Sequence, residues 1–129
     1  MTKNLFHILA VGPHESFYEI FHHLETHESY DLRYATDFDA AHAHLRKNTP
    51  CAILLAVPRD EQTAREALAW LEKVKNQAPV MVLSPVDDMP FYINVMDRGA
   101  FDFFTAHTPL EEIDRVLNNA VDWQFCRAA

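Results

Sequence analysis

The stretch Cys51-Ala52-Ile53-Leu54-Leu55-Ala56-Val57, which Pro58 follows, decides the fold. No polar residue interrupts it from Ala52 to Val57. An apolar run of this length without polar alternation is typical of a strand that is buried on both faces, as in the middle of a parallel sheet. Ligands in such sheets bind beyond the carboxyl ends of the strands. Here that end is Ala56-Val57-Pro58, whose side chains carry no reactive group.

Further strand and helix patterns alternate on both sides of this run. Strands are expected at residues 5–11, 30–35, 80–83 and 101–105, and helices at residues 14–25, 40–47, 60–76, 91–98 and from 108 towards the end. Five strands in strict alternation with five helices predict an α/β fold. We expect a five-stranded parallel sheet with helices on both faces, a (βα)5 three-layer sandwich with right-handed crossovers.

Residues that favour helix ends support these boundaries. Spacings typical of a capping box occur at Ser16 and Glu19, at Thr36 and Asp39, and at Thr108 and Glu111, with Pro109 between the last two. Asp60 and Glu61 suit the start of the third helix, where the helix dipole favours carboxylates. Pro90 suits the first position of the fourth helix, and Gly99 suits its carboxyl-terminal cap.

Length and composition predict one domain over residues 1–129, with a core of about residues 3–122. The last helix runs to the end of the chain. The sequence is therefore either a whole protein or a domain from a longer one, in which this helix leads to an effector domain. The formal net charge of −8 disfavours direct binding to nucleic acid or to an anionic membrane.

The sequence also predicts a cytoplasmic location. No apolar stretch reaches the ~18 residues of a membrane span, and no signal peptide is visible at Met1. The two cysteines, Cys51 and Cys126, show no metal-ligand spacing, so reduced thiols are expected.

Four segments, in this order, resemble the receiver domain of two-component response regulators. They are residues 8–11, 52–56, 79–84 and 98–103, the last reading Arg98-Gly99-Ala100-Phe101-Asp102-Phe103. The resemblance covers about residues 3–122 and implies a flavodoxin-like fold in a signalling or transcription-regulatory protein of a phosphorelay. It places the family's switch Ser/Thr at Ser84 and its switch aromatic at Phe103.

The chain departs from the family where the chemistry takes place. The acidic pair that holds Mg²⁺ corresponds to Gly12 and Pro13, the phosphoacceptor aspartate to Ala56, and the conserved lysine of the family to Ala106. Loss of the nucleophile, the metal ligands and the positive charge together leaves no route to an aspartyl phosphate. We therefore expect a degenerate receiver without catalytic residues, a metal site, Mg²⁺ binding or another cofactor.

Three functions follow as hypotheses. The first is a protein-interaction or homodimerisation module, which the resemblance places on the fourth helix, fifth strand and fifth helix, with Phe91 and Tyr92 as anchors; the first and last helices are another possible face. The second is a small-molecule or nucleotide module that reuses the emptied cleft, lined by Gly12-Pro13, Pro58-Arg59 and Ser84, with Arg59 meeting an anion. The third, an enzyme of another class, lacks a recognisable triad or carboxylate pair.

Structural roles compete with these functional ones. Ser84 suits a strand-end hydroxyl satisfied by backbone, and Phe103 suits a simply buried strand aromatic. Eight histidines are present. His23 and His27 have the spacing of a two-point metal clip, without a third ligand placed by the sequence. His14 and His107 are candidates for a pH response near the emptied pocket, while solvated surface histidines are the general expectation.

Overall fold

The computed structural model describes residues 6–13, 15–58, 60–85 and 87–128, with side-chain environments described as far as residue 120. A 3₁₀ turn, Glu15–Phe17, precedes α1. The elements in chain order are β1 (Phe6–Val11), α1 (Tyr18–Thr26), β2 (Tyr30–Ala35), α2 (Phe38–Lys47), β3 (Ala52–Ala56), α3 (Glu61–Val74), β4 (Val80–Ser84), α4 (Met89–Asp97), β5 (Asp102–Thr105) and α5 (Leu110–Ala128).

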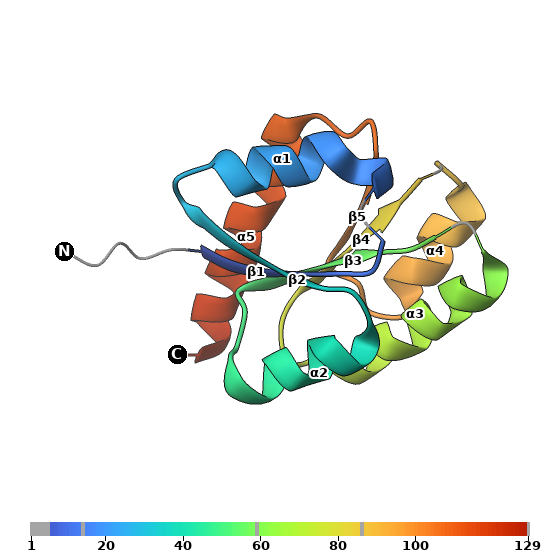
Figure 1. The fold of residues 1–129 in the computed structure, drawn as a ribbon, viewed down its shortest axis with the longest axis horizontal. Coiled ribbons are helices and arrows are strands. Elements are labelled where there is room, and N and C mark those ends of the chain that lie inside the picture. Colours follow the sequence, from blue (N-terminus) through green and yellow to red (C-terminus); the bar gives the residue numbers. More distant parts are fainter. Residues whose placement is uncertain (1–5, 14, 59, 86, 129) are drawn as a thin grey trace.

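The five strands form one parallel sheet in the order β2-β1-β3-β4-β5, which confirms the predicted fold class. The apolar run is the central strand β3, and all five of its residues are buried. Ile53 of β3 lies opposite Leu9 of β1 and Val80 of β4. Figure 1 shows α1 above the sheet and α2 and α3 below it, the three-layer arrangement that the alternation of elements predicts.

Each face of the sheet has its own apolar core, because successive residues of a strand point to opposite faces. Ile53 and Leu55 of β3 pack with residues of α2, α3 and α4. Leu54 and Ala56 pack with residues of α1 and α5. A central strand without polar residues is thus explained, since both of its faces are covered. None of the helices within the described ranges is long and apolar enough to cross a membrane.

The helix starts differ in part from the predicted ones. At α1 no side chain forms the cap hydrogen bond, and a 3₁₀ turn precedes the helix, so the capping box of Ser16 and Glu19 is wrong. At α2 the cap is Asp37 instead of Thr36, with the Ala40 amide donating to its carboxylate over 2.7 Å. Asp37 has extended backbone, which aims its short side chain at the first turn.

At the later helices, too, some of the predicted caps are observed and others differ. Asp60 caps α3 as predicted and accepts a hydrogen bond from the Thr63 amide over 3.0 Å. At α4 the cap is Asp88, so the helix starts at Met89 and Pro90 occupies its second position. Thr108 was predicted to cap α5, which begins at Leu110. Its hydroxyl accepts a hydrogen bond from the Thr105 amide and so closes the turn after β5.

Candidate functional site

The carboxyl ends of β1 and β3 meet with almost no space between them. Gly12, the residue after β1, has a φ of +99°, a conformation that L side chains rarely adopt. A Cβ atom placed on Gly12 would lie 2.5 Å from the carbonyl oxygen of Ala56. The Gly12 amide donates to the Ala35 carbonyl over 3.2 Å, which ties the loop to β2 as well. The first position of the predicted acidic pair, Gly12, and the phosphoacceptor position, Ala56, are therefore neighbours in close backbone contact.

The remaining predicted pocket residues surround this contact. Ala56 and Ser84 are each 2% exposed, at the ends of β3 and β4. Ser84 lies in register with Thr105 of β5. Ala106, in the turn after β5, packs against the core that α1 and α5 cover. The sheet thus brings Gly12, Ala56, Ser84 and Ala106 to one edge, and none of these four carries a charge.

A small cavity of ≈ 160 Å³ remains at this edge. It is lined by Pro13, Ser16, Phe17, Val57, Pro58 and Pro85. Pro13 and Pro58 were expected there, whereas Gly12 and Ser84 do not line it, and Arg59 lies outside the described residues. Ligand sites are usually about 300–1,000 Å³ in volume, so this cavity is small and mostly apolar.

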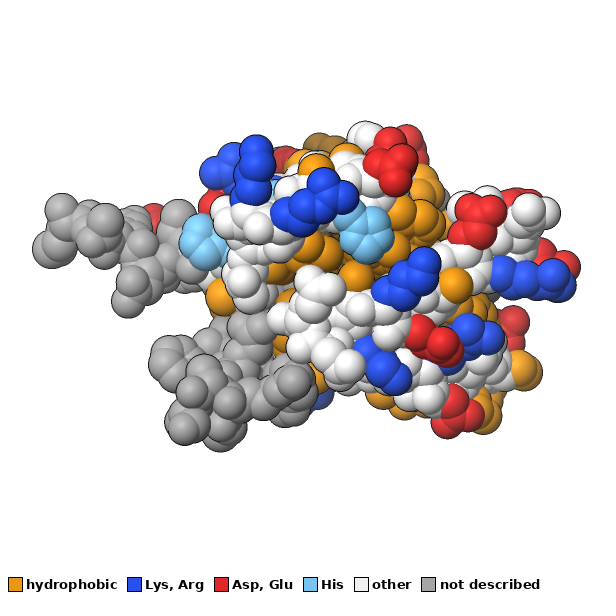
Figure 2. Space-filling view, turned by 90° about the horizontal axis from the view of Figure 1, so that it is seen from below, with side chains coloured by type: hydrophobic (Ala, Val, Ile, Leu, Met, Phe, Trp, Pro, Cys, Tyr) orange, Lys and Arg blue, Asp and Glu red, His pale blue; other side chains and the backbone are white. Residues whose placement is uncertain are grey.

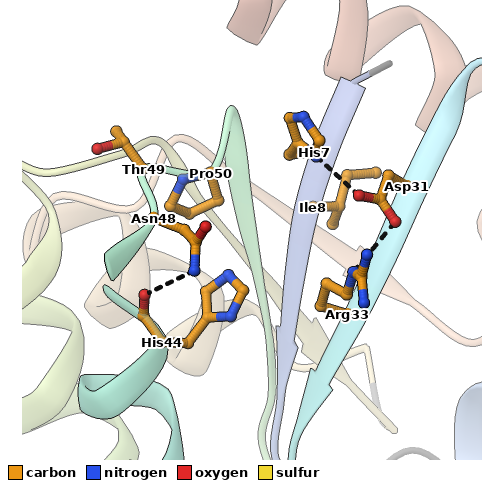
Figure 3. Close-up of a pocket in the computed structure, with 8 residues that line it drawn as sticks. All are labelled: His7, Ile8, Asp31, Arg33, His44, Asn48, Thr49 and Pro50. Carbon is orange, nitrogen blue, oxygen red and sulfur yellow. Dashed lines mark hydrogen bonds and ion pairs between the residues drawn. The ribbon is translucent and has the colours of Figure 1, made fainter. Parts of the chain in front are cut away.

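A larger cavity of ≈ 430 Å³ lies at the opposite, amino-terminal edge of the sheet, where sequence reasoning placed nothing (Figure 3). The Asp31 carboxylate dominates its polar lining, with His7 Nδ1 at 2.8 Å and Arg33 Nε at 3.2 Å. The sequence signal for this cavity was the pair of charged residues Asp31 and Arg33, which are two positions apart and therefore lie on the same face of β2. These charged groups already neutralise one another, and the carboxyl end of α2 next to them disfavours an anion.

Surface charges on the same side are mixed. Figure 2 looks at the molecule from the α2 side and shows Lys and Arg side chains interspersed with Asp and Glu around patches of apolar surface. A nucleic-acid footprint is instead a continuous basic patch or stripe. The charge pattern on this face is therefore that of an ordinary solvated protein surface.

His23, one residue of the predicted two-point metal clip, contacts a carboxylate on α5. His23 Nε2 lies 3.0 Å from both carboxylate oxygens of Asp114, which links α1 to α5. The Tyr30 hydroxyl donates to the same carboxylate over 2.7 Å, and burial together with Asp114 raises the pKa of Tyr30 above its ordinary value. No group of three or more His, Cys, Asp or Glu side chains in the described ranges is arranged to hold a metal. Of the two histidines proposed for a pH response, His107 is exposed and His14 lies outside the described residues.

The predicted interaction surface has aromatic side chains around Phe103. Phe91 and Tyr92 of α4 meet the Phe103 ring edge-on, with centroids at 6.0 Å and 5.5 Å. Phe103 is only half-buried, so its assignment as a simply buried aromatic is wrong, because β5 is an edge strand. Phe91 is half-buried, and Tyr92 is 39% exposed.

Two further apolar side chains on α4 are more exposed than the predicted anchors. Met89 is 64% exposed and Ile93 is 51% exposed. Their spacing with Tyr92, at i, i+3 and i+4, places all three on one helix face. Val95 fills the buried face of the same helix. We call the exposed residues Met89, Tyr92 and Ile93 the α4 patch. In the sequence they form a second apolar stripe beside the buried one, which was the signal for this surface.

The chain is similar to known proteins in structure but not in sequence. No protein-family model matches the chain, and no curated protein is significantly similar to it. A response regulator from Thermotoga maritima aligns with a TM-score of 0.73 and 19% identity, over 88% of this chain and 98% of that one. A receiver domain from Clostridium thermocellum gives 0.75 and 17%, over 95% of this chain and 98% of that one.

A third solved structure, a Burkholderia pseudomallei response regulator with a phosphorylated aspartic acid, a calcium ion and citrate, gives a TM-score of 0.68 and 20% identity. That alignment covers 95% of this chain and 72% of the other. Sequence identities this low support a shared fold but not a shared activity. The chain therefore has the fold of response-regulator receiver domains.

Proposed function

We propose that this chain is a receiver-like signalling domain that works without phosphorylation, through contacts with another protein or with a second copy of itself. The observation that carries the proposal is the backbone contact between Gly12 and Ala56. We place the domain in a cytoplasmic two-component-type signalling or transcription-regulatory protein. We propose no enzymatic activity, no Mg²⁺ requirement and no direct binding of nucleic acid.

Aspartyl phosphorylation needs three groups that the corresponding positions of this chain do not carry. A carboxylate must attack, a divalent cation must bridge oxygens, and a positive charge must neutralise the phosphoryl group. Ala56, Gly12 and Ala106 stand in these places. A side chain at Gly12 would meet the Ala56 carbonyl, which supports the proposal that no metal ligand stands at this position.

The α4 patch is the part of the proposed interaction surface with the strongest support. Exposed apolar side chains grouped on one face are typical of protein-interaction sites, and Tyr is favoured at interface anchors. Tyr92 rests on Phe103, so its ring is held in place before a partner arrives. The alternative face on α1 and α5 has less support, because His23 and Asp114 already bind each other there.

The phosphorylation half of the proposal is tested with acetyl phosphate and with beryllofluoride, each with Mg²⁺. We expect no phosphoryl mass gain and no Mg²⁺-dependent change in the amide NMR spectrum. A receiver domain with an intact acidic pair, treated in parallel, shows that the reagents work. Stoichiometric phosphorylation of this chain would refute the proposal.

The interaction half is tested by sedimentation equilibrium of the whole chain. Ile93→Asp places a charge in the α4 patch, and Ala43→Asp places the same charge on an exposed position of α2 as the matched control. We expect self-association that Ile93→Asp weakens by about tenfold or more and Ala43→Asp leaves unchanged. Equal effects of the two variants would remove the α4 patch from the proposal.

The small-molecule alternative has less support. Among the described residues, the cavity at the carboxyl edge measures ≈ 160 Å³, and Ser16 is the polar residue of its described lining. Small-molecule sites combine a larger apolar volume with several convergent polar groups. A nucleotide that raises the midpoint of thermal unfolding at millimolar concentration would reverse this preference.

A further inference from the structure

A second surface feature lies on the other side of the molecule from the α4 patch. A groove of ≈ 390 Å³ separates α1 from the edge strand β2, and we call it the α1–β2 groove. It is lined by Glu15, Tyr18, Phe21, His22, Glu25 and Tyr34. Tyr18 is 69% exposed and Tyr34 is 40% exposed. Two large aromatic side chains, both partly exposed, therefore border one depression.

The aromatic walls of the α1–β2 groove are held in place by contacts within the chain. The Tyr18 ring stacks on His22, with centroids 5.6 Å apart and planes at 12°. The Tyr34 ring meets Phe21 edge-on at 5.8 Å, and its hydroxyl donates to the Glu25 carboxylate. Burial and the adjacent Glu25 raise the pKa of Tyr34 above its ordinary value. Tyr34 therefore stays a hydrogen-bond donor to Glu25 at physiological pH.

The electrostatics of the α1–β2 groove are one-sided. Glu15 and Glu25 line it, and Glu19 is exposed on the same helix. Within the described part of the chain, none of these three carboxylates forms an ion pair with a lysine or arginine. Arg33, the basic residue on β2, has its side chain on the opposite face of the sheet, where it pairs with Asp31. An incoming cation would thus meet carboxylates that no described lysine or arginine neutralises.

We propose that the α1–β2 groove binds an arginine side chain from a basic segment of a partner protein. A guanidinium stacks on aromatic rings and forms paired hydrogen bonds with carboxylates. The groove offers both, with Tyr18 and Tyr34 as rings and with Glu15 and Glu25 as acceptors towards its two ends. Ten helical residues span about 15 Å, so one guanidinium meets one of these carboxylates at a time. Their charge complements a basic segment, as does the net charge of −8 of the chain. This site goes beyond the proposed function, since it adds a second partner surface away from α4.

The test is an NMR titration of the whole chain with acetyl-Gly-Arg-Gly-Arg-Gly-amide. We expect amide shifts centred on Tyr18 and Tyr34, and weaker binding of the matched peptides with lysine or glutamine in place of arginine. Equal affinity for the lysine peptide, or shifts centred on the α4 patch, would overturn the assignment. The absence of any shift at millimolar peptide would overturn it as well.

Charge-neutralising variants separate this site from attraction to an acidic protein in general. Glu15→Gln combined with Glu25→Gln should weaken peptide binding by about tenfold. Glu66→Gln combined with Glu111→Gln removes the same charge from exposed positions on α3 and α5 and should leave binding within about twofold. Equal weakening by the two pairs would refute a built site.

The aromatic contribution is tested at Tyr18, whose exposure makes the fold tolerant of substitution. Tyr18→Leu keeps apolar area but removes the ring and should weaken binding by about three- to fivefold. Tyr18→Phe keeps the ring and should restore the affinity. If sedimentation equilibrium instead shows a dimer that Tyr18→Leu dissociates, the groove is covered by a second copy, and the proposal is wrong.

Discussion

Replacing Gly12 with alanine tests whether the carboxyl edge of the sheet is closed by backbone contact. The new Cβ would lie 2.5 Å from the Ala56 carbonyl oxygen, about 0.5 Å or more inside any normal contact. Neither partner moves easily, because Ala56 belongs to the central strand and Gly12 is hydrogen-bonded to Ala35. The substitution must therefore strain the loop or displace the end of β3.

Two destabilising effects and one stabilising effect determine how much Gly12→Ala changes the free energy of unfolding. An L residue at positive φ costs roughly 1–2 kcal/mol, and an unrelieved clash in a packed site costs roughly 1–3 kcal/mol. Alanine reduces the entropy of the unfolded chain, which returns about 0.4–1 kcal/mol. We expect Gly12→Ala to lower the free energy of unfolding by about 2–4 kcal/mol, a large share of the roughly 5–15 kcal/mol typical of a domain.

Gly99 offers a matched control in the same chain. Its φ of +104° imposes the same backbone strain. The atom that its Cβ would meet, at 2.6 Å, is Cδ of Lys75, part of a flexible side chain that can turn away. Gly99→Ala should therefore cost about 1 kcal/mol, the strain without the clash.

Urea unfolding followed by far-ultraviolet circular dichroism measures the difference. With a slope of about 2 kcal/mol per molar urea, Gly12→Ala should lower the midpoint by roughly 1–2 M and Gly99→Ala by about 0.5 M. The slope itself should stay constant, since neither variant changes the surface exposed on unfolding. A Gly12→Ala variant as stable as Gly99→Ala would refute the closed edge on which the proposed function rests.

Two smaller predictions concern local contacts. Tyr30 and Tyr34 should ionise at a higher pH than free tyrosine in an absorbance titration, because burial and a neighbouring carboxylate raise their pKa. The stabilisation from the raised pKa is complete below about pH 10 and lost as the pH rises above it, so Tyr30→Phe should flatten the alkaline loss of stability. Asp37→Ala should cost about 1 kcal/mol by urea unfolding, and Thr36→Ala less than about 0.5 kcal/mol, since the cap of α2 is Asp37; a reversed order would contradict the observed cap.

The architecture could be predicted because its signals are local. The apolar run of β3 needs no partner to be recognised, and burial on both faces follows from its composition. Gly99 after α4 and Asp60 before α3 act within one helical turn of their own positions. Thr36 and Asp37 show the limit, since both suit a helix cap and the backbone angles decide between them.

The site could be predicted as a set of positions but not as a geometry. Family resemblance places Gly12, Ala56, Ser84 and Ala106 together, and the parallel register does bring them to one edge. The contact between Gly12 and Ala56 depends on how β1 and β3 pair, which no local pattern encodes. The link between His23 and Asp114 is hidden for the same reason, because α1 and α5 are the first and last helices.

The physical link between the closed edge and the α4 patch runs through β4 and β5. Ser84 and Thr105 lie in register at the carboxyl ends of these strands, and Phe103 sits two residues before Thr105. The rings of Phe91 and Tyr92 rest on Phe103 from the α4 side. A phosphoryl group at the strand ends would have to act through these contacts to alter α4. If the edge takes no phosphate, as we propose, no phosphoryl group biases the packing of Phe103, and we expect the α4 patch to be accessible to a partner at all times.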